Sequence, residues 1–192
     1  APYIEGEATL RYQGQNSFVR LRGIDPLLEA EVVNNQGQRY RQLLASLAAT
    51  ENGIILGAQL AGSLGIYTSG EVSAIALSSL LSRSLADSQG FEVVGFADFG
   101  VYSNGNIALI NMPSARRLFQ RDPGVDLQLR LRVGDVFEAE AIVASAFSTV
   151  SGVTLVPWNI AQASLFNALN MEKLLTAFML LMIVIIGAVN IV

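Results

Sequence analysis

The sequence predicts an α+β domain followed by the start of a transmembrane helix. Three observations lead to this prediction: short runs with strand alternation, apolar residues at helical spacing between them, and an uncharged apolar run over residues 174–192. As a helix that run extends about 28 Å, close to the thickness of a bilayer's hydrocarbon. A buried core helix is the alternative, but the unbroken apolar stretch from Met179 to Ile186 would leave it no polar face. The chain starts at Ala1 without a methionine and stops inside the apolar run, so we expect a piece of a longer membrane protein.

The first elements expected are a β-hairpin and a capped helix. Two alternating runs, residues 3–12 and 18–23, are joined by Gln13-Gly14-Gln15-Asn16, which is typical of a hairpin. Asp25-Pro26 then combines an N-cap residue with proline at the first helical position, so a short helix should cover residues 27–33.

The middle of the chain alternates short apolar strands with helices. After Asn52-Gly53 the order is strand, glycine, helix, and antiparallel pairing of the strands is expected. The expected strands are residues 54–56, 71–77, 91–96 and 107–110, and the expected helices include residues 43–48, 58–64 and 112–119.

The clearest strand pattern lies at residues 125–133. Val125, Leu127, Leu129, Leu131 and Val133 alternate strictly with polar residues, which predicts one face in the core and one in water. After it we expect a helix over 138–146, a last strand over 153–156, and a helix that starts at 157–159 and continues into the membrane.

Composition excludes several functions. The net charge is −4, the only lysine is Lys173, and the arginines are scattered, so the basic face that nucleic acid requires is missing. With no cysteine there is no disulfide and no thiolate metal site.

No catalytic, metal or cofactor site is expected. Residues 57–63 have P-loop glycine spacing but lack its lysine, so a strand-to-helix turn is favoured. A serine nucleophile would need Lys173 or a carboxylate as its base, because histidine is absent, and Lys173 is better explained as an anchor at the membrane edge. The spacing of acidic residues in two clusters matches no calcium-binding loop, and both clusters are interpreted as solvated helix faces. They are Asp25, Glu29 and Glu31, and Asp135, Glu138 and Glu140.

Residues 78–90 connect two predicted strands and allow two interpretations. Leu80, Leu81 and Leu85 beside Arg83 would suit a projecting surface that binds a partner. The fourfold spacing of Leu77, Leu81 and Leu85 would equally suit a short helix folded back on the sheet.

A series of segments along nearly the whole chain carries a family resemblance. They are 1–8, 53–57, 60–61, 64–66, 70–73, 91–96, 100–102, 127–131 with Asp135, Ala139 and Ala141, then Trp158, 167–169, 172–173 and 190–192. In this order they resemble the permeases of the MacB/FtsX superfamily of ABC transporters, and most closely the LolC/LolE-type lipoprotein-releasing permeases.

The resemblance implies a MacB-like periplasmic domain of two subdomains. Residues 1–50 and 124–173 would form a porter-like α+β part, residues 51–123 an inserted β-rich part, and residues 174–192 the truncated transmembrane helix. The domain would lie in the periplasm over the bacterial inner membrane. A separate ABC ATPase subunit would hydrolyse ATP, and a second permease subunit would complete a homo- or heterodimer.

The implied function is to extract lipoproteins from the inner membrane and pass them to a periplasmic LolA-like carrier. Residues 78–90 lie where one subunit of the family carries a carrier-binding hook, so Leu80, Leu81, Arg83 and Leu85 are the expected contacts; the prolines that bracket that hook are missing here. Phe178, Met182 and Ile186 are expected to face lipid or acyl chains. An FtsX-like regulatory module, a MacB-like efflux permease and, third, a membrane-bound hydrolase are the alternatives.

Overall fold

The computed structural model describes residues 1–33, 37–81, 88–100, 105–120, 122, 124–135, 138–147, 154, 156 and 163–191. The chain divides into two compact units, Ala1–Arg132 and Val133–Val192. Each unit is described by itself.

The first unit begins with the predicted hairpin. Strand β1 (Pro2–Tyr12) pairs antiparallel with β2 (Gln15–Ile24) along its length, and Tyr12 lies opposite Gln15. The two turn residues, Gln13 and Gly14, have φ values of 45° and 89°. Positive φ at both central residues is the geometry of a two-residue turn whose twist matches the strands, and glycine adopts it without strain.

The strands of this unit form a sheet that closes into a barrel. The order is β2-β6-β3-β5-β4-β1, and β1 pairs again with β2, so six strands complete the ring. The pairs β2–β6 and β3–β5 are parallel and the others antiparallel, so the expected antiparallel pairing holds for most of the ring. The remaining strands are β3 (Gly53–Gly57), β4 (Glu71–Ala76), β5 (Gln89–Ala97), β6 (Ile107–Asn111) and β7 (Leu127–Leu129), which extends the sheet from β1.

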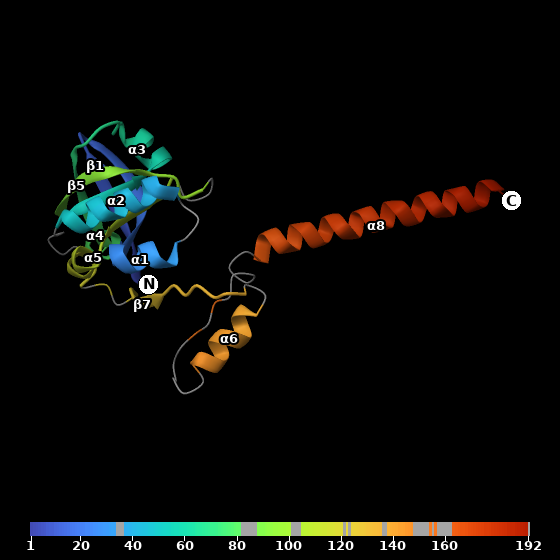
Figure 1. Ribbon diagram of the computed structural model, residues 1–192. Helices are drawn as coiled ribbons and strands as arrows, with labels where there is room; N and C mark the ends of the chain where they lie inside the picture. The colour runs from blue at the N-terminus through green and yellow to red at the C-terminus, as the bar shows by residue number, and fades with distance from the viewer. Residues whose placement is uncertain are drawn as a thin grey trace. The chain divides into compact units, whose positions relative to one another are not determined.

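The helices described in the same unit are labelled in Figure 1. They are α1 (Pro26–Val32), α2 (Gly37–Ala49), α3 (Ala58–Leu64), α4 (Leu77–Leu81) and α5 (Met112–Leu118). The Asp25 cap is confirmed, since its Oδ1 accepts hydrogen bonds from the amides of Leu27 and Leu28 at 3.1 and 3.3 Å. Residues 57–63 form the expected strand-to-helix turn from β3 into α3.

Two apolar cores follow from the alternation of strand side chains. Leu10, Leu21 and Leu56 share one cluster with Leu60 of α3 and Phe119, which follows α5. Strand residues on the opposite face point the other way: Ile24 of β2, Ile55 of β3 and Leu109 of β6 pack with Leu44 and Leu47 of α2. Helix α2 therefore covers the outer face of the barrel while the first cluster fills its interior.

Strand β7 corrects the prediction for residues 125–133. It has three residues, and Leu127, Leu129 and Leu131 are 58%, 57% and 46% exposed, so of the described apolar face only Val125 packs against the first core cluster. Leu127 lies opposite Ile4, so the leucine face continues the face of β1 that points into the barrel. The pattern identified the apolar face correctly, but β7 extends the sheet beyond the closed ring, where that face is uncovered.

The second unit contains two described helices, α6 (Ala139–Ala146) and α8 (Ala163–Ile191). Within α8, Asn167–Gly187 is long and apolar enough to cross a membrane, with a mean hydropathy of 2.0. Of the strand expected at 153–156, Thr154 and Val156 are described and neither is in a strand, while its other positions lie outside the described residues.

The α+β prediction, with a C-terminal apolar helix that could start a transmembrane span, is confirmed. Strands of both predicted subdomains, 1–50 and 51–123, pair within the one sheet. The division into a porter-like part and an inserted part stays a prediction.

Candidate functional site

The segment expected to contact a partner begins with α4, directly after β4. Leu77 at its start is half-buried, whereas Leu80 is 44% exposed. Helix α4 packs beside β1 and β4. The helical part of the prediction is therefore present, and it presents an apolar side chain to solvent at Leu80.

The rest of this candidate site falls partly outside the described residues. Arg83 and Leu85 lie there, and Leu81 is described in its helical backbone only. The chain is described again from Ser88, and Gln89 begins β5. The choice between a projecting hook and a helix folded back on the sheet stays open.

The expected lipid-facing residues all lie on α8. Phe178, Met182 and Ile186 are 58%, 45% and 61% exposed and follow one another at four-residue spacing. Residues four apart differ by about 400°, which is one turn plus about 40°, so these side chains form a stripe along one side of the helix. The hydroxyl of Thr176 donates to the carbonyl of Glu172 at 2.9 Å, which pairs that hydroxyl within its own helix.

A buried ion pair that sequence analysis missed lies where the chain leaves β7. Glu29 on α1 is 2% exposed, and its Oε1 accepts a hydrogen bond from Nη1 of Arg130 at 2.5 Å. The main chain is fixed at the same point, because the amide of Arg130 donates to the carbonyl of Ala1 at 2.8 Å and the Ala1 ammonium donates back at 2.8 Å. The interpretation of Glu29 as part of a solvated face is therefore wrong; the partners are 101 residues apart, and no local pattern joins them.

A second ion pair lies beside the first, on the hairpin. Glu5 Oε2 accepts hydrogen bonds from Nε of Arg22 at 2.8 Å and from its Nη2 at 2.5 Å. The guanidinium carbons of Arg22 and Arg130 lie 5.0 and 5.6 Å from the centroid of the Tyr3 ring. Cations within about 6 Å of a ring are attracted to its face. Tyr3 therefore links the two ion pairs, and together they fix the end of β1 to α1 and to the residues after β7.

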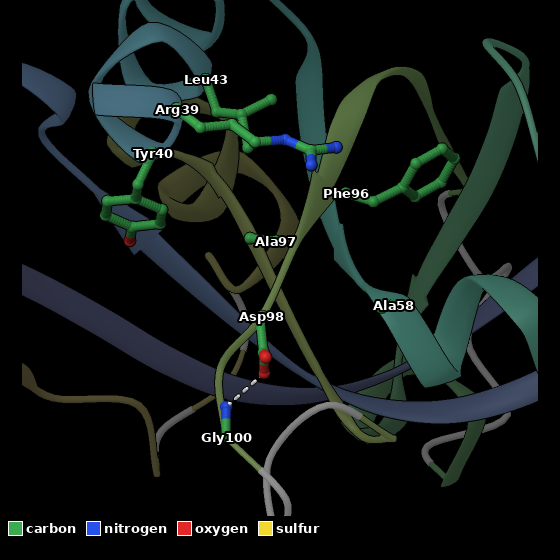
Figure 2. Close-up of a pocket in the computed structure, with 8 residues that line it drawn as sticks. All are labelled: Arg39, Tyr40, Leu43, Ala58, Phe96, Ala97, Asp98 and Gly100. Atoms are coloured by element: carbon green, nitrogen blue, oxygen red, sulfur yellow. Dashed lines mark hydrogen bonds between the residues drawn. The ribbon is translucent and has the colours of Figure 1, made fainter. Parts of the chain in front are cut away.

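A pocket of about 530 Å³ lies between α2 and the end of β5 (Figure 2). Burial and the nearby Glu29 carboxylate raise the pKa of Tyr40 from 10 to about 12. Asp98 accepts a hydrogen bond from the amide of Gly100 at 2.9 Å, as Figure 2 shows. The lining residues are Arg39, Tyr40, Leu43, Ala58, Phe96, Ala97, Asp98 and Gly100.

The remaining sequence-based interpretations concern titratable groups. Lys173 lies on α8 and is exposed, one residue before the apolar run. Asp135 and Glu138 are exposed and precede α6, and Glu140 is described in its helical backbone only, so the solvated helix face stays a prediction. Among the described residues, no three carboxylates or histidines are grouped so that they could hold a metal ion.

Comparison of the sequence with known proteins shows which proteins this chain is similar to. No family model matches the chain. The lipoprotein-releasing system transmembrane protein LolC of Neisseria meningitidis serogroup B is 30% identical over 197 residues, which covers 100% of this chain and 47% of that protein. LolC of two Xylella fastidiosa strains is 29% identical over 201 residues, with the same coverage.

The resemblance to LolC-type permeases is confirmed. It extends over the whole chain, including the apolar helix α8. The chain spans about half the length of the LolC proteins it matches.

Proposed function

We propose that this chain is the extracytoplasmic domain, with the start of the following membrane helix, of an ABC transporter permease subunit for lipoprotein release. The observation that carries the proposal is the whole-length similarity to three LolC proteins together with an apolar helix at the predicted place. The domain would lie in the periplasm, above the inner membrane. The permease would extract lipoproteins from that membrane and pass them to a soluble LolA-like carrier.

In this proposal ATP is hydrolysed on a separate ABC ATPase subunit, and a second permease subunit completes the transporter. The turn from β3 into α3 has glycine spacing like that of a P-loop, but Ser63 stands where the lysine belongs and Leu64 where the hydroxyl residue belongs, which leaves no lysine to clamp the β- and γ-phosphates. In this proposal the energy for release reaches this domain mechanically.

Helix α8 supports such mechanical coupling. It runs without a break from Ala163, before the membrane-compatible span, to Ile191. A continuous helix transmits tilt from one end to the other, so a movement in the bilayer would reach the chain outside it. The stripe of Phe178, Met182 and Ile186 would contact the acyl chains of the lipoprotein or the bilayer, and the flexible Met182 side chain suits acyl chains that vary.

The carrier would bind at α4 and the residues that follow it. Leu80 supplies an exposed apolar side chain at the described start of this surface, and Leu81, Arg83 and Leu85 are its expected further contacts. Apolar anchors beside an arginine are the residue types that dominate compact protein contacts.

The experiment is capture of a LolA-like carrier by the full chain in detergent or nanodiscs. Leu80→Asp should weaken capture at least tenfold, since removing one anchor typically costs about 2 kcal/mol of binding. Tyr67→Asp is the matched control, because Tyr67 is also exposed, at 78%, and lies outside α4. Equal capture by both variants and the unchanged chain would refute this surface, and no capture by the unchanged chain would refute the carrier-binding role.

A further inference from the structure

The outer edge of β7 is open among the described strands. In the strand order β7 comes last, and its described partner is β1. Arg130 and Ala1 exchange main-chain hydrogen bonds, so in this antiparallel ladder Gln128 and Arg130 direct their main-chain groups toward β1. Leu127 and Leu129 consequently direct their N–H and C=O groups toward the open edge, and Leu131 would do the same in a strand that continues past Arg130.

The side chains along this edge would match those of a second, antiparallel copy. Residues at equal distances on either side of Leu129 are complementary. Leu127 and Leu131 are both leucines, Gln128 and Arg130 are both polar, and Asp126 and Arg132 carry opposite charges. Asp126 and Arg132 are both exposed. If two copies pair with Leu129 opposite Leu129, each Asp126 lies directly opposite an Arg132 of the other copy.

We propose that β7 pairs antiparallel with β7 of a second copy of this chain, centred on Leu129, and joins the two sheets. The main-chain groups agree with this centre, because Leu129 opposite Leu129 and Leu127 opposite Leu131 would both be hydrogen-bonded pairs. The charged pairs then fall at the non-hydrogen-bonded positions, where opposed side chains are closer. The six leucines lie together on one face of the joined ladder.

Two registers shifted toward the C-terminus are less favourable. A centre at Arg130 would use the same edge-facing main-chain groups, those of Leu129 and Leu131, but it would place two arginines directly opposite each other. A centre at Leu131 would place Arg130 opposite Arg132 of the other copy. All three registers satisfy the hydrogen-bonding groups, and among them the Leu129 register alone avoids placing arginines opposite each other. The pairing uses residues of the first unit and is independent of the proposed role in lipoprotein release.

The absence of cysteine makes the register testable by cross-linking, since a single introduced cysteine can form a disulfide only with another copy. In the full chain, in vesicles under oxidation, Leu129→Cys should form covalent dimers, because hydrogen-bonded partners lie about 5.5 Å apart between Cα atoms, within disulfide range. Leu127→Cys is the control: it faces position 131 of the other copy, so its twin lies about 13 Å away. Mixing Leu127→Cys chains with Leu131→Cys chains should restore the disulfide.

Charge reversal tests the same contact without cysteine. Asp126→Arg should weaken self-association about tenfold, because it places two arginine pairs across the two-fold axis. The double variant Asp126→Arg with Arg132→Asp exchanges the two charges and should restore the association, measured by energy transfer between labelled copies in vesicles.

Three results would overturn the proposal. One is a Leu129→Cys disulfide that forms no faster than that of Leu127→Cys. Another is an Asp126→Arg variant that associates as strongly as the unchanged chain, or whose loss is not recovered by the double variant. The third is a chain that stays monomeric in vesicles, which would mean that another part of the chain or the lipid covers the edge.

Discussion

Replacing Arg130 by methionine should destabilise the first unit far more than replacing an exposed arginine. Arg130→Met keeps most of the side-chain volume but leaves the Glu29 carboxylate, 2% exposed, without its cation. Breaking a buried pair from one side costs about 3–5 kcal/mol. Since the Arg130 side chain is 34% exposed and partly hydrated, the lower end, about 3 kcal/mol, is expected.

The assay is thermal unfolding followed by circular dichroism, in detergent. For a unit of this size 1 kcal/mol shifts Tm by about 3–4 °C, so Arg130→Met should lower Tm by roughly 10 °C. Arg116→Met is the matched control, because Arg116 lies exposed on α5, and it should change Tm by less than about 2 °C.

A double variant separates the pair from the rest of the site. Glu29→Leu with Arg130→Met removes both charges and should be more stable than Arg130→Met alone, because no buried charge is left without a partner. If Arg130→Met unfolds at the same temperature as Arg116→Met, or if the double variant is the least stable of the three, the account of this ion pair is refuted.

Three further predictions concern pH, packing and the membrane. The pKa of Tyr40 is about 12 in the folded state against an ordinary value of 10, so the unfolded chain loses this proton first as the pH rises. The free energy of unfolding should therefore fall above pH 10 by about 1.4 kcal/mol per pH unit. Tyr40→Phe should remove this part of the slope in alkaline denaturation curves. Gly23→Ala should destabilise the first unit, since the new Cβ would lie 2.1 Å from that of Ala115. Gly62→Ala in α3 meets nothing within 4 Å and should stabilise the unit by up to about 1 kcal/mol. In urea unfolding, a stabilising Gly23→Ala or a destabilising Gly62→Ala would contradict the packing described. Truncation after Asn170 should give a folded, soluble domain, and sedimentation of that truncated chain with membranes would locate the anchor elsewhere.

Local chemistry made much of the fold predictable. The Asp25-Pro26 cap, the two-residue hairpin turn and the step from β3 into α3 each depend on neighbours in sequence, and each was found where it was expected. The apolar length of α8 likewise belongs to one segment.

What the sequence could not reveal depends on distant residues. Closure of the barrel requires β1 to pair with β2 and β4 at once, and no local pattern records that. The same holds for Glu29, whose partner is Arg130, and for Leu127, whose alternation indicates an apolar face but not whether another element covers it. The segment after Leu80 stays a prediction based on the family resemblance.

The central claim, that this chain serves lipoprotein release, is tested most directly by ATP-dependent transfer of a triacylated lipoprotein. The measurement uses membrane vesicles that contain the whole permease and its ATPase, with a LolA-like carrier outside the bilayer on the side of this domain. The account predicts carrier-bound lipoprotein that is strongly reduced by Leu80→Asp and unchanged by Tyr67→Asp. Transfer that continues equally when residues 1–132 are deleted from the permease would contradict it.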